Sequence, residues 1–259
     1  MQRIILFPVN FVIDFFEGIG RYTLLMISMF RSIGSWSSFF SRTIDQMVTI
    51  GIKSIPIVML TSFFSGMVTS VQSAYQITSS FIPPETIGSI VGESILLELA
   101  PVISALVLTG RVGATITAEI GTMRVTEQID ALESLSFDPI SFLILPRVIS
   151  GIIMFPILII IADYCGITGG WISVIFDPDI NVTSFQFFDG FKQWFKVWDA
   201  WFGLIKALFF GFAITSIACY HGYYTEGGAA GVGKSTTISV VSSCVAVVFL
   251  DYLLSSILL

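Results

Sequence analysis

Charged residues are scarce in this chain of 259 residues, where Asp, Glu, Lys and Arg together make up 12% of the sequence. The net charge of −6 gives no basic surface of the kind that binds nucleic acid, so a nucleic-acid partner is excluded. There is one histidine, His221, and each of the three cysteines lies inside an apolar run, which gives no set of metal ligands and no disulfide framework. We therefore expect no metal, no cofactor and no catalytic residue.

Several long stretches have no charged residue at all. Hydrophobic residues form 54% of the chain, more than a soluble domain of this length can bury. Strict apolar/polar alternation is absent, which excludes a β-barrel and leaves helices as the means of crossing a bilayer. Since about 20 apolar residues suffice for one crossing, we predict five transmembrane helices, over about residues 54–74, 94–108 (continuing helically beyond), 148–174, 200–220 and 237–258.

The N-terminal segment differs from these spans. Residues 4–30 mix apolar residues with charged ones, which is too charged for a span and too apolar for a solvated helix. An amphipathic helix lying in the membrane interface fits this pattern. The predicted fold is an all-α integral membrane protein with one domain over residues 1–259. It comprises an N-terminal interfacial helix and connection (1–45) and a five-helix transmembrane region (46–259).

Lysine and arginine are distributed unequally between the two sides of the predicted spans, and this bias sets the orientation. One side carries Arg3, Arg21, Arg31, Arg42, Lys53, Arg111, Arg124, Arg147 and Lys234. The other side has only Lys192 and Lys196, while Lys206 falls within the membrane. We predict that the N-terminus is cytoplasmic and that the C-terminus is on the far side.

Residues 228–235 (GAAGVGKS) match the nucleotide-binding P-loop pattern G-x4-G-K-[ST]. A P-loop needs a buried strand before it and a helix after it, within a sheet that supplies an acidic magnesium ligand. Here predicted transmembrane helices flank the match, and no soluble stretch is long enough to build such a sheet. We interpret residues 225–234 as a tight cytoplasmic turn with Lys234 at the headgroups. If ATP is used, another chain hydrolyses it.

The most charged part of the chain lies between the second and third predicted spans. Residues 110–139 have a helical, amphipathic pattern with no run long enough to span. Small residues such as Gly113 and Gly121 indicate close helix packing, and the mixture of charge signs suits docking to a partner. A solvated connecting loop is the alternative, and it explains these features less well than a cytoplasmic helix.

These motifs together resemble the MlaE/YrbE permeases of the Mla (maintenance of lipid asymmetry) ABC systems. The stretch GRVGATITAEIGTMRVTEQIDAL has LLELAP before it and DP-x6-PR after it, and the later GGAAGVGKSTT and LDYLL also match. The resemblance covers nearly the whole chain. It implies a non-catalytic permease subunit that forms a homodimer in the bacterial inner membrane and moves phospholipid. Its implied partners are cytoplasmic ATPase subunits and a periplasmic ring protein with MCE domains.

The resemblance also implies roles for particular residues. It identifies a cytoplasmic coupling helix near residues 117–135 that contacts the ATPase, with the candidate docking residues Glu119, Arg124, Glu127, Asp130 and Leu132. The P-loop-like segment becomes an ordinary loop of the family. Many relatives carry a basic residue where this chain has Leu97, so a basic contact with a lipid headgroup at that position is not expected.

Four ionisable residues fall within or near the predicted spans: Glu98, Asp163, Lys206 and Asp251. Each costs a few kcal/mol if exposed to lipid at mid-bilayer, so they should face the interior or a wet cavity. At about 1.5 Å of rise per residue, Glu98, Lys206 and Asp251 reach a similar depth in the outer half of the membrane. Two interpretations stay open: an ion pair, such as Lys206 with Asp251, that only joins helices, or a polar part of a lipid cavity.

We expect Glu98 and Lys206 to line the cavity, because both resemble polar positions of the family's lipid pocket. Pro101 has no N–H, so it frees a backbone carbonyl one turn earlier, near Leu97. A carboxylate beside this carbonyl makes a polar spot in an apolar wall, and Lys206 supplies the positive charge that a phosphate prefers. The predicted lipid-contact residues are thus Glu98, Lys206, Leu97 and Pro101.

Two other functions stay open on the sequence. A stand-alone secondary transporter would use Glu98 or Asp163 as a proton carrier, although no clear internal repeat of the kind that such transporters often show is visible. A membrane enzyme would use the P-loop-like segment. Co-purification of a soluble ATPase, or nucleotide binding by the chain alone, would discriminate among these functions.

Overall fold

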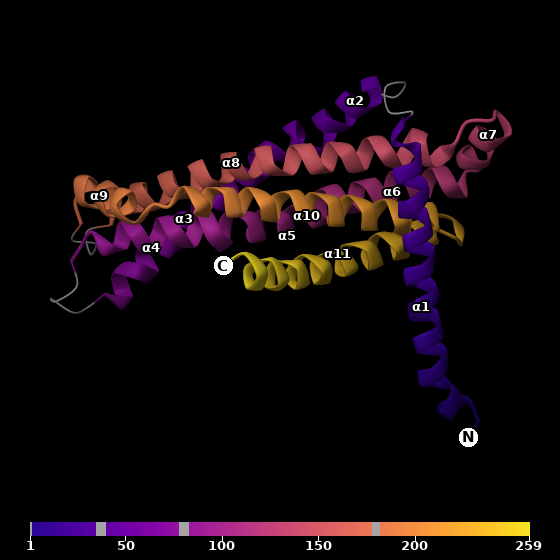
Figure 1. The fold of residues 1–259 in the computed structure, drawn as a ribbon, viewed down its shortest axis with the longest axis horizontal. Helices are drawn as coiled ribbons and strands as arrows, with labels where there is room; N and C mark the ends of the chain where they lie inside the picture. The colour runs from indigo at the N-terminus through magenta and orange to yellow at the C-terminus, as the bar shows by residue number, and fades with distance from the viewer. Residues whose placement is uncertain (1, 35–39, 78–82, 178–181) are drawn as a thin grey trace.

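The computed structural model describes residues 2–34, 40–77, 83–177 and 182–259, without the side chains of residues 2–15. These residues form helices and no strand (Figure 1). Five helical stretches are long and apolar enough to cross a membrane: Phe40–Gln76, Thr86–Val125, Ile140–Phe176, Val197–Tyr223 and Gly228–Leu258. The prediction of an all-α fold with five spans is confirmed.

Three of the spans are composite helices. The first joins α2 (Phe40–Ile50), η2 (Ile52–Ser54) and α3 (Ile55–Gln76). The second joins α4 (Thr86–Ser94), η3 (Ile95–Ile103), α5 (Ser104–Leu108), η4 (Thr109–Gly113) and α6 (Ala114–Val125). The third joins η5 (Ile140–Ile144) and α8 (Leu145–Phe176), while the last two are α10 (Val197–Tyr223) and α11 (Gly228–Leu258). Outside the spans lie α1 (Gln2–Arg31), α7 (Gln128–Ser134) and α9 (Ser184–Trp194).

All five spans are longer than the sequence predicted, and the extensions are largest in the first two. The first begins at Phe40, so the expected boundary between residues 45 and 46 falls inside α2. The second continues past Leu108 to Val125, because no helix-breaking residue interrupts the polar segment that follows. Its 40 residues extend about 60 Å, roughly twice the hydrocarbon thickness of a bilayer. The start of the expected cytoplasmic helix is therefore the projecting end of this span.

The second span is π-helical at η3 and at η4. Pro101 lies inside η3 and has no N–H to give to the carbonyl of Leu97, four residues earlier. A wider π-turn accommodates such a missing bond, and turns of this kind occur often at functional sites. The irregular turn carries Glu98.

Glycine allows the spans to pack closely. A Cβ atom on Gly66 of α3 would lie 1.9 Å from the carbonyl oxygen of Gly166 on α8, and one on Gly169 would lie 2.1 Å from that of Phe63. Small residues bring the α3 and α8 backbones together in this way, as is common between membrane helices. The most buried span is α10, which lies between its neighbours in the bundle.

The N-terminal helix α1 runs across the other helices rather than along them (Figure 1). It is attached to the bundle by a hydrogen bond of 2.8 Å between Tyr22 Oη and Ser216 Oγ of α10. Just after α1, Ser32 Oγ donates to Asp138 Oδ2 at 3.1 Å. A helix in the plane of the membrane surface would need such a crossing orientation, and the interfacial position of residues 4–30 stays a prediction.

The expected glycine-rich turn is mostly helix. α10 ends at Tyr223 and α11 begins at Gly228, and the turn between them uses positive φ values of 89° at Gly227 and 67° at Gly228. Residues 229–235 form the first turns of α11, so the prediction of a tight turn over 225–234 is wrong for most of its length. The P-loop-like segment, residues 228–235, therefore belongs to α11 itself and has a helical backbone rather than the open phosphate-binding loop of a P-loop.

Candidate functional site

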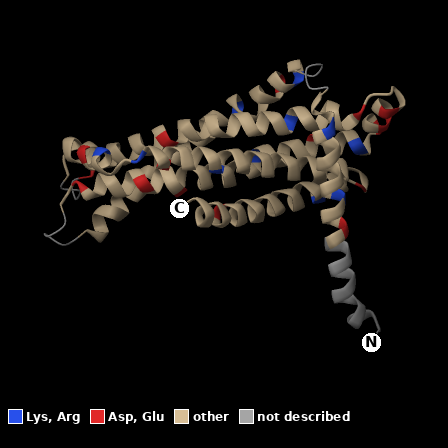
Figure 2. Cartoon of the chain, in the orientation of Figure 1, with Lys and Arg blue, Asp and Glu red and all other residues tan. Residues whose placement is uncertain are grey.

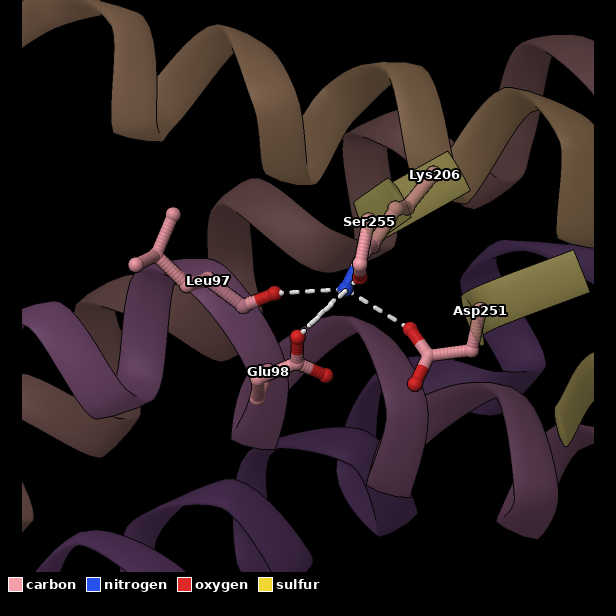
Figure 3. A network of polar contacts seen from close by, with 5 residues as sticks. All are labelled: Leu97, Glu98, Lys206, Asp251 and Ser255. Atoms are coloured by element: carbon pink, nitrogen blue, oxygen red, sulfur yellow. Dashed lines mark hydrogen bonds and ion pairs between the residues drawn. The ribbon is translucent and has the colours of Figure 1, made fainter. Parts of the chain in front are cut away.

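Lys206 of α10 is the centre of a polar cluster within the spans (Figure 3). Its side chain is fully buried. The ammonium nitrogen donates to the carbonyl oxygen of Leu97 at 3.0 Å and to Glu98 Oε1 at 2.8 Å. Asp251 Oδ1 of α11 lies 2.7 Å from the same nitrogen, in an ion pair whose angle falls outside hydrogen-bond geometry. One lysine thus joins η3, α10 and α11. We use the name Lys206 cluster for Leu97, Glu98, Lys206, Asp251 and Ser255.

The carbonyl of Leu97 is free to accept a hydrogen bond from Lys206 because of Pro101. The sequence predicted a carbonyl near Leu97 that Pro101 leaves without its α-helical donor, and this carbonyl is the one that accepts from Lys206. Pro101 is itself buried, whereas the side chain of Leu97 is half-buried. Pro101 therefore shapes the cluster through the backbone, and of the two only the Leu97 side chain is open to a ligand.

Exposure differs among the charged members of the cluster. The Glu98 side chain is 45% exposed and that of Asp251 is 21% exposed, while Lys206 is not exposed at all. Ser255 Oγ, one turn after Asp251, donates to Glu98 Oε1 at 3.4 Å. One cation faces two carboxylates, so the cluster has a formal negative charge, and Glu98 is the member that it presents outward. Because the chain's own oxygens surround the ammonium group, a phosphate can reach Lys206 only by displacing one of them.

Of the two interpretations that the sequence left open, the structure shows the ion pair, and the lipid-cavity role stays a prediction. The ion pair of Lys206 with Asp251 is present and joins α10 to α11. The same lysine also fixes Glu98, which faces outward. Similar depth, deduced from the rise per residue, correctly placed these three residues together. Ser255 was missed, although its position four residues after Asp251 on one helix face was a usable signal.

Asp163 lies apart from the Lys206 cluster, in the middle of α8. Its Oδ1 atom is buried and has no hydrogen-bond partner within the part of the chain that the structure describes. Among the described residues it forms no hydrogen bond or ion pair with the Lys206 cluster. A lone carboxylate inside a span is a candidate functional residue by default. Asp163 is therefore a candidate, but no neighbouring group in the described part of the chain indicates which role it has.

The predicted coupling helix is broken in two. α6 ends at Val125, Glu127 adopts a left-handed conformation with φ of 60°, and α7 begins at Gln128. The prediction of one helix near 117–135 is therefore wrong, because a left-handed residue ends the regular helical hydrogen bonding. Arg124 Nη1 lies 2.8 Å from Asp130 Oδ1 and bridges the break.

The candidate docking residues of this segment differ in accessibility. Glu127 and Asp130 are exposed, whereas Arg124 and Leu132 are half-buried. Glu119 is half-buried, and its Oε2 lies 3.0 Å from Nη2 of a buried Arg147, so it is already engaged within the bundle. A docking partner therefore meets the α6–α7 turn first, rather than the whole predicted helix.

Two exposed apolar residues next to this turn were missed by the sequence reasoning. Leu135 is 69% exposed and Phe137 is 48% exposed, both just after α7. Large apolar side chains at the tip of a polar segment are unusual unless another surface covers them. Leu135 and Phe137 lie between the charged residues Glu133 and Asp138 in the sequence, and this pattern could have identified them.

An apolar groove of about 1000 Å³ opens between α1, α10 and α11. Its lining includes Ile19, Phe209, Phe212 and Phe249. No member of the Lys206 cluster lines it. The groove offers space for hydrocarbon chains but few polar groups for a headgroup.

The sequence is similar to known proteins over most of its length. The family described as Permease MlaE matches residues 43–257. A probable ABC transporter permease protein of Rickettsia prowazekii is 43% identical over 243 residues, which cover 94% of this chain and 93% of that protein. The intermembrane phospholipid transport system permease protein MlaE of Haemophilus influenzae is 34% identical over 248 residues, covering 95% and 94%. The chloroplastic protein TRIGALACTOSYLDIACYLGLYCEROL 1 of Arabidopsis thaliana is 36% identical over 215 residues, covering 83% and 61%.

Proposed function

The chain belongs to the MlaE permease family and is a multi-pass membrane permease subunit, and from this premise we propose that it moves phospholipid between the bacterial inner membrane and a periplasmic MCE-domain carrier. In this proposal it works as a homodimer, and a separate cytoplasmic subunit hydrolyses ATP. The printed name of the Haemophilus relative, a phospholipid transport permease, supports the choice of substrate.

The Lys206 cluster is the observation that carries the proposal. A phospholipid needs an apolar wall for its chains and a few polar groups for its head, and Glu98 is a partly exposed carboxylate in an otherwise apolar stretch of the second span. The buried Lys206 fixes the position of Glu98 through their hydrogen bond. If one of the two carboxylates moved away, the ammonium group of Lys206 would become available to a phosphate. Leu97 and Pro101 complete the apolar wall for the acyl chains. Leu97 contributes its side chain, and Pro101 contributes the π-helical turn of η3.

The opposite end of the bundle supports docking of an ATPase. Figure 2 shows lysine and arginine near the end that carries α1, α6 and α7, and such an excess favours the cytoplasmic side. We place the N-terminus there, with the C-terminus periplasmic. The α6–α7 turn, with Arg124, Glu127 and Asp130, projects from this end. The ATPase would contact this turn and transmit its conformational change to the permease there. The spans would respond as packed units that rock and change the cavity.

The test is purification of the full chain with its co-expressed partners in mild detergent, followed by identification of bound proteins and quantification of phospholipid. Glu98→Gln should reduce bound phospholipid without reducing expression or dimer formation. Glu93→Gln is the matched control, because Glu93 is a half-buried carboxylate of α4 in the same span, outside the cluster. Equal lipid content in both variants would contradict the cavity role, and a chain that transports without an ATPase would favour a secondary transporter using Asp163.

A further inference from the structure

A second polar site lies in the same span as Glu98, about 20 Å further along at the rise of an α-helix. It is a cleft of about 200 Å³ between the first and second spans. Its polar lining consists of Gln46, Thr49 and Lys53 on one wall and Arg111, Thr115 and Glu119 on the other. Within each wall these residues are three or four positions apart, so each set forms one stripe of its helix.

The cleft carries positive charge that no carboxylate neutralises. Arg111 Nη1 donates to the hydroxyl of Ser54, which is neutral. Lys53 is exposed and makes no hydrogen bond or ion pair with any of the residues described. Glu119 is the acidic residue of the lining, and Arg147 already pairs with it at 3.0 Å. The lining therefore offers two cations to an anion, in a chain whose net charge is −6.

Gln46 provides an independent indication of a ligand. Its Oε1 atom is buried and lacks a hydrogen-bond partner in the described part of the chain. A buried amide group without a partner is costly. Because the oxygen and nitrogen of an amide can be exchanged by a rotation, this side chain can donate to a phosphate oxygen or accept from a hydroxyl of a headgroup.

An apolar track leads from the cleft toward the middle of the membrane. Lys53 is followed at helical spacing by Ile57, Leu60 and Phe64 of α3, which are 39%, 58% and 55% exposed. A cation at the end of a stripe of exposed apolar side chains matches the shape of a phospholipid, with its charged head at the interface and its chain in the hydrocarbon layer. Free phosphate would not use this track.

We propose that the cleft binds the phosphate of an anionic phospholipid in the leaflet on the α6–α7 side, with Lys53 and Arg111 as phosphate ligands. Ile57, Leu60 and Phe64 form the surface along which one acyl chain lies. The site is separate from the Lys206 cluster. It requires only that the chain spans a membrane, so it does not depend on the proposed transport of phospholipid.

The test measures binding of phosphatidylglycerol and of phosphatidylcholine to the full-length chain in detergent by native mass spectrometry. Lys53→Gln should weaken phosphatidylglycerol binding about tenfold, the expected effect of losing one charge-assisted hydrogen bond, and should abolish the preference over phosphatidylcholine. Lys53→Arg should retain both. Lys192→Gln is the matched control, since Lys192 is an exposed lysine of α9 outside the cleft. Lys53 is exposed, so its replacement does not threaten folding.

Arg111→Gln should give the same loss. Glu93→Gln should leave the preference intact, because Glu93 lies in the same span but outside both the cleft and the Lys206 cluster. Excess inorganic phosphate should not displace the lipid, because it makes no contact with the apolar track. Unchanged phosphatidylglycerol binding in Lys53→Gln would overturn the proposal. Saturation of the site by inorganic phosphate with no preference for the lipid would overturn the assignment to a lipid.

Discussion

Replacing Lys206 with methionine removes the ammonium group but keeps the length of the side chain, so it isolates the role of the charge. The carbonyl of Leu97 and the carboxylates of Glu98 and Asp251 lose their shared partner at once. Removal of one partner from a buried ion pair costs about 3–5 kcal/mol. Glu98 is 45% exposed and water can solvate it, so most of the cost falls on Asp251. We therefore expect a destabilisation of about 2–4 kcal/mol.

The two carboxylate variants should behave differently. Glu98→Gln or Asp251→Asn alone leaves Lys206 with one counter-ion, so each should cost about 1 kcal/mol, the order of one hydrogen bond or one partly exposed ion pair. The double variant leaves a fully buried cation with no counter-ion. It should be less stable than the sum of the single changes predicts, because the two carboxylates substitute for one another.

The assay is thermal unfolding of the purified chain in detergent, with bound phospholipid per chain measured on the same samples. Lys192→Met serves as the control, because Lys192 is an exposed lysine of α9. Lys206→Met unfolding at the temperature of the unmodified chain, or a strictly additive double variant, would refute the shared-lysine argument. Lower unfolding temperatures with normal lipid content would instead assign the cluster a purely structural role and remove the cavity role of Glu98 and Lys206.

Three further predictions address other parts of the molecule. Lys234→Ala should leave transport-coupled ATP hydrolysis largely intact, because Lys234 is an exposed residue of a helix; hydrolysis reduced to the level of a catalytically dead ATPase would contradict this. Charge reversal at Arg124 or Glu127 should detach the ATPase while the permease stays inserted, and unchanged co-purification of the ATPase in both variants would count against docking at the α6–α7 turn. Asp163→Asn should preserve ATP-driven transport in vesicles, since no partner links this carboxylate to the Lys206 cluster; complete loss of transport by a stably folded variant would revive the proton-carrier hypothesis.

The proximity of three charges within the spans could be predicted from the sequence, but the direction in which each side chain points could not. A fixed rise per residue placed Glu98, Lys206 and Asp251 at one level, and the chemistry of Pro101 identified the carbonyl of Leu97. In a soluble helix, apolar periodicity would also show which face is buried. In lipid both faces are apolar, so nothing in the sequence indicated that Lys206 would be fully buried and Glu98 partly exposed.

The ends of helices were less predictable than their existence. The second span was expected over about residues 94–108 with a helical continuation of unstated length, and the helix ends at Val125. The break at Glu127 has no sequence signal, because left-handed residues are usually glycine or asparagine. The contact between Arg124 and Asp130 across the break is a feature of the folded chain that accompanies this turn.

The helix α10 connects the two ends at which function is proposed. Lys206 lies in its first half, and Tyr223 ends it about 25 Å away at helical rise. Tyr223 Oη donates to Glu133 at 3.5 Å, and the guanidinium of Arg124 lies 5.8 Å from the centre of its ring. A partner that displaces α7 must therefore break these contacts or move α10 with it. Since α10 is the most buried span and closely packed helices move as units, moving it would shift Lys206 against Glu98. Such a shift would loosen one carboxylate and open the ammonium group to a phosphate.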